Sequence, residues 1–342
     1  MNKIDIKSMT IEELEELLIS FKQPKFRAKQ IFDWLHVKKV LIFAEMSNLP
    51  KSLIEVLDES CTITNLSIKR KLVSQIDETT KYLFELPDSE FVESVVMKYK
   101  HGNSICISTQ VGCKMGCAFC ASTKAGFVRN LTPSEILEQI YAAGKDIGER
   151  ISNVVLMGIG EPLDNYDNVI RFLNLLSNEN GHNLSLRHVS LSTCGVVDKI
   201  YELARLKLGL TLSISLHAPN DQIRSQTMPI NNRFNMDELL KACKEYANTT
   251  SRRISFEYAL IRGVNDSEAC ANELASKLKG MLCHVNLIPV NEIKETDFKK
   301  TYPKNVVNFQ QWLVKKGINT TIRRTLGADI SAACGQLRRD NL

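Results

Sequence analysis

One pattern fills most of the chain: from about residue 102 to residue 324, a short apolar strand is followed by a helical stretch, six times in series. The first of these helical stretches begins at Thr132-Pro133-Ser134-Glu135, a capping box with proline in the first turn. The strands are predicted at residues 105–107, 153–157, 188–193, 210–217, 252–261 and 284–290, with a last strand at 319–324. Six βα units in series predict an α/β fold with a parallel sheet, either doubly wound or curled into a full or partial barrel, and periodicity does not choose between these.

The first hundred residues follow a different pattern. A capping box at Thr10-Ile11-Glu12-Glu13 precedes one amphipathic helix, and a second helix is predicted from Phe26 to Leu35. Strands rich in β-branched residues are predicted next, at residues 63–72, 80–86 and 91–97. We therefore expect a helical N-terminal accessory domain (1–60), a β-rich connecting segment (61–98), an α/β core domain (99–328) and a short C-terminal tail (329–342).

Composition places the chain among ordinary globular proteins. Of its 342 residues, 44% are hydrophobic and 24% are charged, which excludes collagen-like, disordered and small disulfide-stapled classes. The net charge of +5 neither demands nor excludes a nucleic-acid partner. The sequence has no signal-peptide core and no stretch approaching the roughly 20 apolar residues of a membrane span, so we expect a cytoplasmic protein with no membrane partner.

Ten cysteines in a reducing compartment are not expected to form a structural disulfide framework, and a tight cluster among them indicates metal binding or chemistry. Cys113, Cys117 and Cys120 form such a cluster, with C-x3-C-x2-C spacing on the loop that leaves the first strand. That loop can fold back so that three sulfurs face one centre, as iron–sulfur ligation requires. A closed zinc site normally has four ligands, whereas a 4Fe–4S cluster held by three thiolates leaves one iron open. The alternatives are a zinc site completed by a remote residue and three unrelated buried cysteines.

The aromatic Phe119 just before the third cysteine gives the motif a form that closely resembles the radical S-adenosylmethionine (SAM) superfamily. The resemblance implies a partial (βα)6 barrel, one 4Fe–4S cluster, and SAM chelated by the open iron. Gly160 and Glu161, soon after the second strand, resemble the superfamily's amino-acid-binding element, in which glycine allows close backbone approach and the carboxylate accepts from the SAM ammonium. A turn before a helix-starting proline, Pro162, explains the same residues.

Several further residues stand at the C-terminal ends of later strands, the edge where such sheets gather ligands. They are Ser192, Ser215, Leu216, His217 and Asn291. Their polar groups can hydrogen-bond the ribose, carboxylate or adenine of SAM. Taken singly, a serine or histidine at a strand end is an ordinary structural residue. Taken together on successive strands, these residues predict one shared pocket.

More motifs extend the resemblance, in order, through nearly the whole chain. They are Arg129-Asn130-Leu131-Thr132, Gly160-Glu161-Pro162-Leu163-Asp164-Asn165-Tyr166, Leu191-Ser192-Thr193-Cys194-Gly195, Ser215-Leu216-His217-Ala218-Pro219-Asn220, Met228-Pro229-Ile230-Asn231, Gly263-Val264-Asn265-Asp266 and Asp329-Ile330-Ser331-Ala332-Ala333-Cys334-Gly335-Gln336-Leu337. With the cysteine cluster and the helical start, they resemble the RlmN/Cfr family of radical SAM RNA methyltransferases. Pro162 and the stretch 165–168 are closer to the RlmN branch, and Ile159 replaces the family's usual Met with a residue of similar size.

The resemblance implies methylation of adenine C2 by way of two cysteines and two SAM molecules per turnover. Cys334, as a thiolate, would take a methyl group from one SAM, and a 5′-deoxyadenosyl radical from the second would abstract a hydrogen from that S-methyl group. The methylene radical would add to C2, and Cys106 would then attack the sulfur of Cys334, leaving a transient Cys106–Cys334 disulfide. Packing is the alternative for both residues, and it is our interpretation of Cys61, Cys194, Cys243, Cys270 and Cys283.

Glu93 occupies the position of the family's proton acceptor. Strand alternation puts it on the same face as Phe91 and Val95, and opposite Val92 and Ser94. A carboxylate among apolar neighbours has a raised pKa, which suits a base that works near neutrality. The alternative is a solvent-facing strand residue.

The implied partners are 23S rRNA, methylated at an adenine of the peptidyl-transferase centre before ribosome assembly is complete, and tRNA, methylated at the adenine 3′ of the anticodon. An electron donor such as flavodoxin or ferredoxin is also implied. Basic residues that can contact phosphates are Lys69-Arg70-Lys71, Arg252-Arg253, Lys299-Lys300, Lys304, Arg323-Arg324 and Arg338-Arg339. The alternatives are a Cfr-type adenine-C8 methyltransferase conferring ribosomal antibiotic resistance, a radical SAM enzyme acting on a small molecule or peptide, and a zinc-containing RNA-binding protein.

Overall fold

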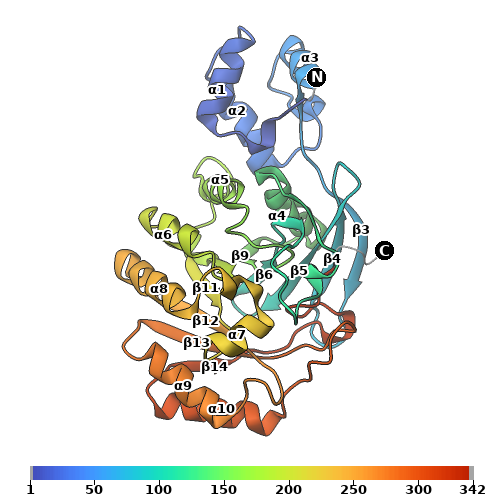
Figure 1. Ribbon diagram of the computed structural model, residues 1–342. Helices are drawn as coiled ribbons and strands as arrows, with labels where there is room; N and C mark the ends of the chain where they lie inside the picture. Colours follow the sequence, from blue (N-terminus) through green and yellow to red (C-terminus); the bar gives the residue numbers. More distant parts are fainter. Residues whose placement is uncertain (1–2, 339–342) are drawn as a thin grey trace.

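A ten-stranded mixed sheet forms the centre of the computed structural model, which describes residues 3–338 (Figure 1). Its order is β14-β13-β12-β11-β10-β9-β6-β5-β4-β3. The strands are β3 (Ser67–Val73), β4 (Thr80–Glu85), β5 (Phe91–Tyr99), β6 (Gly102–Cys106), β9 (Ile151–Leu156), β10 (Val189–Thr193), β11 (Thr211–Ser215), β12 (Ile254–Leu260), β13 (Cys283–Pro289) and β14 (Thr320–Ile322). From β6 to β14 the strands are parallel, and each adds to the same edge. The parallel strands therefore form an open sheet that is wound in one direction. This is a partial barrel rather than a doubly wound sheet or a closed barrel.

The helices that follow the parallel strands lie along one side of this sheet (Figure 1). They are α4 (Pro133–Ile147), α5 (Tyr166–Ser177), α6 (Val197–Arg205), α7 (Asp221–Thr227), α8 (Met236–Thr250), α9 (Glu268–Leu278) and α10 (Pro303–Lys315). Apart from α7, each turns an apolar side inward; in α6, for example, Ile200 and Leu203 are fully buried. The buried residues of α7 are Arg224 and Thr227. The predicted capping box at the start of α4 is confirmed, since Thr132 and Glu135 cap each other's backbone amides. Within residues 3–338, no helix combines the length and apolar character that crossing a membrane requires.

The N-terminal segment packs helices against α4 and α5. It contains β1 (Ile4–Asp5), a short 3-10 turn (Ile6–Ser8), α1 (Ile11–Ser20), α2 (Arg27–Asp33) with a π-helical extension (Trp34–Lys38), a second 3-10 turn (Phe43–Glu45), α3 (Lys51–Ser60) and β2 (Cys61–Thr62). The predicted capping box of Thr10 and Glu13 begins α1. The buried Lys7 ammonium bonds the Glu138 carboxylate at 2.8 Å and the Thr64 carbonyl at 2.5 Å, and so fastens this segment to α4. The domain boundaries stay a prediction, and residues 1–2 and 339–342 of the predicted end segments lie outside the described residues.

The three antiparallel strands β3, β4 and β5 extend the parallel sheet beyond β6. Their register aligns Lys81 with Val95, Val95 with Cys106, and Cys106 with Val155, so these residues form one row across four strands. Residues 327–338, here called the C-terminal tail, cross the sheet on the face that carries this row. Ala332 and Leu337 of the tail form a small apolar core with Val95 and Cys106. We call this part of the sheet, on β4, β5 and β6, the tail face.

Candidate active site

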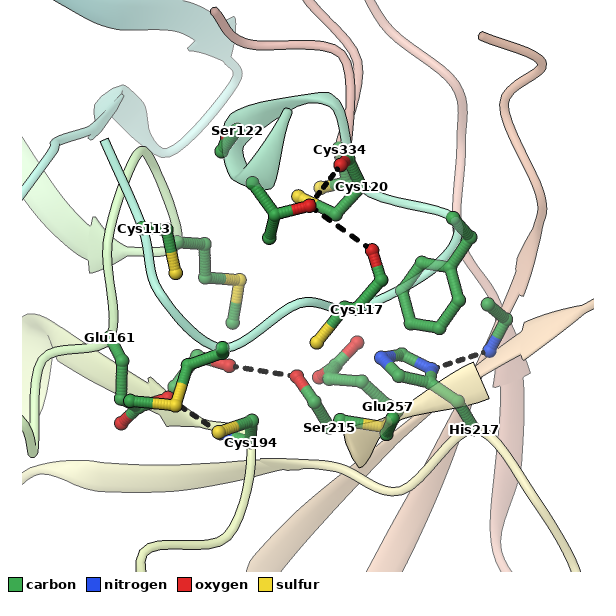
Figure 2. A pocket seen from close by; sticks show the side chains of 18 of the residues that line it. Cys113, Cys117, Cys120, Ser122, Glu161, Cys194, Ser215, His217, Glu257 and Cys334 are labelled. Atoms are coloured by element: carbon green, nitrogen blue, oxygen red, sulfur yellow. Dashed lines mark hydrogen bonds between the residues drawn. The ribbon is translucent and has the colours of Figure 1, made fainter. Parts of the chain in front are cut away.

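The C-terminal ends of the parallel strands surround one pocket, shown in Figure 2, which we call the strand-end pocket. The structure brings ten predicted site residues together around it: Cys113, Cys117, Cys120, Gly160, Glu161, Ser192, Ser215, His217, Asn291 and Cys334. Leu216 is fully buried and does not line the pocket; its amide donates to the Glu257 carbonyl at 3.0 Å. Cys106 and Glu93 line two other cavities that border the tail.

The three clustered thiols line the strand-end pocket from a loop that is held at both ends. The Ala118 amide donates to the Thr227 carbonyl, and the Ala121 amide to the Gly335 carbonyl, each at 2.8 Å. Burial raises the pKa of the Cys113 thiol to about 12, and it raises the pKa values of Cys117 and Cys120 as well. Thiols in this setting lose their protons only to a strongly bound cation, because a ligating thiol is deprotonated by the metal it binds.

The donor set fits an iron–sulfur cluster. In a 4Fe–4S cluster, each thiolate binds its own iron at a separate corner. Cys113, Cys117 and Cys120 share one pocket and come from one loop, so the residues present suit a cluster with three protein ligands.

The loop that carries Glu161 folds tightly against the segment after β6. A β-carbon on Gly160, whose φ is +104°, would lie 2.6 Å from the Gln110 side chain, and one on Gly158 would lie 2.6 Å from the Ile107 carbonyl. The glycines therefore serve packing within the chain, a reason different from the predicted approach to a ligand. The Glu161 carboxylate accepts from the Cys194 amide at 2.7 Å and the Leu163 amide at 3.0 Å.

The Glu161 carboxylate is buried and lines the strand-end pocket. Burial raises the pKa of its carboxyl, and hydrogen bonds from the Cys194 amide, the Thr193 side chain, the Leu163 amide and the Cys194 side chain partly offset that rise.

His217 presents a neutral imidazole to the pocket. Its Nδ1 accepts from the Ala259 amide at 2.8 Å, which places the ring proton on Nε2. Burial lowers the pKa of His217 to about 3, so the ring stays uncharged near neutrality. The backbone is left-handed here, with φ of +55°, and Asn265 holds it by donating to the His217 and Ala259 carbonyls at 2.7 Å each. This explains the 263–266 motif, which sequence reasoning quoted without a role.

No sequence pattern predicted a role for Arg224, although its side chain joins two strand ends at the strand-end pocket. Its side chain is fully buried, and its Nη2 donates to the Cys194 carbonyl at 2.6 Å and the Ser215 carbonyl at 3.3 Å. It thus ties together the ends of β10 and β11. Asn231, in the quoted 228–231 motif, accepts from Arg224 Nη1 at 3.1 Å. The 228–231 motif was the one sequence signal close to Arg224, and it indicated a nearby turn rather than the arginine itself.

Cys334 reaches the strand-end pocket from the C-terminal tail. Its carbonyl accepts from Asn291 Nδ2 at 3.0 Å, and its Sγ lies 3.4 Å from the Arg323 guanidinium. Arg323 also lies 3.6 Å from the buried carboxylate of Glu257. Glu257 lines the strand-end pocket as well, although no sequence pattern predicted it. Asn291, predicted to bind SAM, bonds the tail in this structure.

Cys106 lies beside Cys334 in a smaller adjoining pocket, lined also by Met157 and Arg323. Burial, with the neighbouring Cys334 as a further cause, raises the pKa of Cys106 to about 12. All ten cysteines are free, so the predicted Cys106–Cys334 disulfide is absent from this structure. The two thiols nonetheless line one small pocket.

Glu93 has surroundings that differ from both sequence interpretations. Its side chain is only 1% exposed, so it does not face solvent, and its partner is a cation rather than apolar side chains. Lys81 Nζ lies 3.0 Å from Glu93 Oε1, and the Arg338 amide donates to Oε2 at 2.8 Å. The predicted apolar setting is present in part, since Leu83 stands opposite Glu93 in the register of β4 and β5. The cation comes from Lys81, two residues from Leu83 on β4, which alternation along β5 alone does not reveal.

Several of the predicted phosphate contacts pair with groups of the protein itself. Arg323 contacts Cys334 and Glu257, and Arg338 of the tail pairs with Glu295. Lys69, Lys71 and Lys299 pair with the carboxylates of Glu85, Asp146 and Glu292. Arg339 lies outside the described residues.

The fold and this pocket define a radical SAM protein. The sequence pattern of the Radical SAM superfamily matches residues 107–271, and that of a ribosomal RNA large subunit methyltransferase N-terminal domain matches residues 4–63. A protein from Clostridium novyi (strain NT) is 56% identical over 98% of both chains, and one from Alkaliphilus oremlandii (strain OhILAs) is 56% identical over 100% of this chain and 99% of its own; both are described as probable dual-specificity RNA methyltransferase RlmN.

The crystal structure of a radical SAM methyltransferase from Sphaerobacter thermophilus superposes with a TM-score of 0.94 at 42% identity, covering 98% of this chain and 100% of that one. The chain therefore belongs to the RlmN family of radical SAM proteins. Its cofactors are accordingly a 4Fe–4S cluster and SAM.

Proposed function

We propose that this protein is an RNA methyltransferase that places a methyl group on C2 of adenine and uses Cys334 as the methyl carrier. One observation carries the proposal: a cysteine on the C-terminal tail lines the same pocket as the three clustered thiols and shares a second pocket with another thiol. A radical SAM enzyme acting on a small molecule has no need of that pair. The names of the relatives support RNA as the substrate.

The strand-end pocket holds the cofactors in this proposal. Cys113, Cys117 and Cys120 bind three irons of the cluster, which when bound to SAM supplies a radical able to abstract hydrogen. Glu161 accepts from the ammonium of SAM, and Ser192 and Ser215, whose hydroxyls lie 3.5 Å apart, offer donors and acceptors from neighbouring strands. The neutral His217 offers an Nε2–H donor.

Cys334 and Cys106 act in successive steps of the methyl transfer: Cys334 carries the methyl group, and Cys106 releases the methylated RNA. Cys334 attacks the methyl group of one SAM as a thiolate, and the Arg323 guanidinium lies 3.4 Å from its sulfur. The methyl group on Cys334, after losing one hydrogen atom, bonds to C2 of adenine, and the resulting adduct radical gives one electron to a one-electron carrier of the flavodoxin or ferredoxin class. The C2 proton then passes to Glu93, and its electron pair stays with the adenine ring. Cys106 loses its proton and attacks the Cys334 sulfur: an S–S bond forms, the C–S bond breaks, and the methylene carbon takes a proton. A reductant must then restore the two thiols.

The finer substrate assignment follows the same reasoning. We propose 23S rRNA before full ribosome assembly and tRNA as substrates, and flavodoxin or ferredoxin as the class of electron donor. The relatives' description as dual-specificity enzymes supports two kinds of RNA. An adenine inside folded RNA has to be extruded to reach a pocket at the strand ends, which favours bases in accessible loops.

Mass spectrometry of RNA nucleosides tests the proposal. Anaerobically reconstituted protein, SAM and a reductant are incubated with 23S rRNA or tRNA transcripts, and 2-methyladenosine is expected as the product. Finding only 8-methyladenosine would replace the proposal with the Cfr-type reaction, and finding no methylated RNA would refute it.

Replacing Cys334 tests the carrier role. Cys334→Ala is expected to abolish methylation of RNA while iron and sulfide content stay at the wild-type level. Normal turnover by Cys334→Ala would contradict a two-cysteine route. One zinc per chain without iron or sulfide would instead support the RNA-binding alternative.

A further inference from the structure

The tail face contains a buried ion pair that the radical chemistry leaves unexplained. Lys81 is 5% exposed and Glu93 is 1% exposed, and their charged groups lie 3.0 Å apart. Charged residues are seldom buried to this degree, and a buried pair is commonly no more stabilising than apolar side chains of the same volume. Stability alone is therefore a weak reason for a lysine in the middle of β4.

The strand register connects this pair to the reacting thiols. Lys81 stands opposite Val95, and Val95 stands opposite Cys106, so Lys81 and Cys106 belong to one row on one face. Glu93 precedes Val95 by two residues and shares that face. The lysine and the glutamate thus approach Cys106 from the same side of the sheet.

The C-terminal tail bridges the ion pair with its backbone. Lys81 Nζ donates to the Ser331 carbonyl at 3.3 Å, and Glu93 Oε2 accepts from the Arg338 amide at 2.8 Å. These two contacts lie on either side of Cys334. A pair that holds both flanks of the tail can fix where the tail runs.

Cys334 itself is held by other residues. Asn291 binds its carbonyl, Arg323 lies against its sulfur, and the Ala121 amide binds the carbonyl of Gly335. Loss of the Lys81 contacts would therefore leave Cys334 at the strand-end pocket while it disturbs Glu93 and the tail segments around it.

A polar cavity opens on the same pair. Its charged lining comes from three further elements: Arg70 on β3, Glu292 and Lys294 on the loop after β13, and Asp329 and Arg338 on the tail. The cavity gives Glu93 a route for proton exchange that does not pass through the strand-end pocket. In the present arrangement, both carboxylate oxygens of Glu93 have partners on Lys81 and the tail.

We propose that Lys81 is a positioning residue, which orients the carboxylate of Glu93 and fastens the C-terminal tail over it. The inference rests on the proposed function, in which Glu93 takes the C2 proton of the protein–RNA adduct. In that step, the C2–H bond breaks, its electron pair stays with the adenine ring and the proton moves to a Glu93 oxygen. Without Lys81, the carboxylate and the tail lose their common anchor, so the adduct persists.

Three species measured in one reaction test this role. The reaction uses full-length reconstituted protein, SAM, a reductant and a 23S rRNA transcript. Intact-protein mass spectrometry measures S-methylated Cys334, denaturing gels measure the covalent protein–RNA adduct, and nucleoside mass spectrometry measures methyladenosine. Lys81→Met is expected to keep S-methylation within about twofold of wild type, to accumulate adduct, and to lower the rate of product formation about tenfold or more, because loss of a positioning residue costs less than the roughly hundredfold or more that a proton-transfer group contributes.

Two variants separate positioning from folding. Lys81→Arg keeps the cation and is expected to restore most product formation. Lys7→Met removes the lysine of the other buried lysine–glutamate pair, which holds the N-terminal segment, and is expected to change stability without accumulating adduct. Wild-type product formation by Lys81→Met, or equal loss of S-methylation and product in Lys81→Met and Lys81→Arg, would overturn the proposal.

Amide hydrogen exchange tests the tail contact without any RNA. Faster exchange in residues 327–338 of Lys81→Met, and not of Lys7→Met, is expected; unchanged exchange would overturn the fastening role. If wild-type protein forms no methyladenosine at all, the proposed function fails, and the exchange experiment still decides whether Lys81 holds the tail.

Discussion

The strand-end pocket and the tail face adjoin each other at Cys334, yet they are assembled differently. The pocket is tied together by side chains of the barrel itself, such as Arg224 across β10 and β11 and Asn265 across His217 and Ala259. The tail face depends on pairing between residues far apart in sequence: Lys81 to Ser331 spans 250 positions, and Glu93 to Arg338 spans 245.

This difference separates a region built within the barrel from one that depends on the tail. Buried groups that hold each other across neighbouring strands leave little freedom, which suits a pocket that must orient cofactors. The tail is held by hydrogen bonds to several elements, among them those of Ser74, Ser122 and Asn291, and by the apolar core at Val95 and Cys106, so the position of its cysteine depends on contacts with distant segments. The variants below test that division.

Removing a cluster ligand should cause the largest loss, because it disables both regions. Cys117→Ser is expected to abolish reductive cleavage of SAM and methylation of RNA, measured as 5′-deoxyadenosine and methyladenosine. Cys243→Ala, which removes a buried thiol on α8 away from the pocket, is the control and should retain both activities. Persistent SAM cleavage by Cys117→Ser would contradict the assignment of the cluster loop.

Replacing Cys106, the second thiol, should impair only the release of methylated RNA, the step proposed for the tail face. Cys106→Ala is expected to cleave SAM and methylate Cys334, while covalent protein–RNA adduct replaces free methylated RNA on denaturing gels. Cys283→Ala serves as the matched control. Multiple turnovers by Cys106→Ala would show that another group releases the RNA, and would remove the chemical role of this face.

Glu93→Gln should slow the release of methylated RNA by about a hundredfold to ten-thousandfold, the range typical of a lost proton-transfer group. The comparison variant is Glu138→Gln, which alters the carboxylate of the other buried pair, bonded to Lys7. We expect Glu138→Gln to lower stability and leave turnover per folded molecule unchanged. Equal effects of both substitutions on turnover would mean that Glu93 is structural.

Arg224→Met should loosen the strand-end pocket. Several carbonyls would lose a buried donor, at about 1–3 kcal/mol for each unsatisfied group, so we expect the free energy of unfolding to fall by about 2–4 kcal/mol. SAM binding, measured by equilibrium dialysis, should weaken as the ends of β10 and β11 separate. Arg205→Met, on the exposed end of α6, is expected to change neither quantity.

A pH experiment probes a third place, the N-terminal segment, where no role in catalysis is proposed. His36 is fully buried, and burial lowers its pKa to about 3. Between pH 6.5 and 3 the unfolded chain therefore binds a proton that the folded protein does not, so stability falls as pH falls. This histidine accounts for about 2 kcal/mol of lost stability at pH 5. Denaturant titrations at pH 7 and pH 5 should show a smaller difference for His36→Phe than for wild type.

The features of the fold and site that could be predicted from the sequence are those that depend on local sequence patterns. The strands of the barrel, the Thr132 cap and the spacing of Cys113, Cys117 and Cys120 each depend on residues close together in the chain. The polar residues at strand ends were found because parallel strands end at a common edge.

The parts that could not be predicted depend on contacts between distant segments. Lys81 meets Glu93 only through the register of β4 on β5, and Ser331 and Arg338 join them from the other end of the chain. Alternation predicted the face of Glu93, but it did not predict the Lys81 cation beside the carboxylate. Arg224 carries no local signal, since a lone arginine in a helix is most often exposed.

Transfer of a labelled methyl group tests the central claim, that Cys334 carries the methyl group to RNA, most directly. The reaction is run with SAM whose methyl group holds three deuterium atoms, and the methyladenosine is analysed by mass spectrometry. If the methyl group passes through Cys334 and loses one hydrogen there, the product methyl contains two deuterium atoms and the third appears in 5′-deoxyadenosine. A product that retains all three deuterium atoms would mean direct transfer from SAM, and would contradict the account.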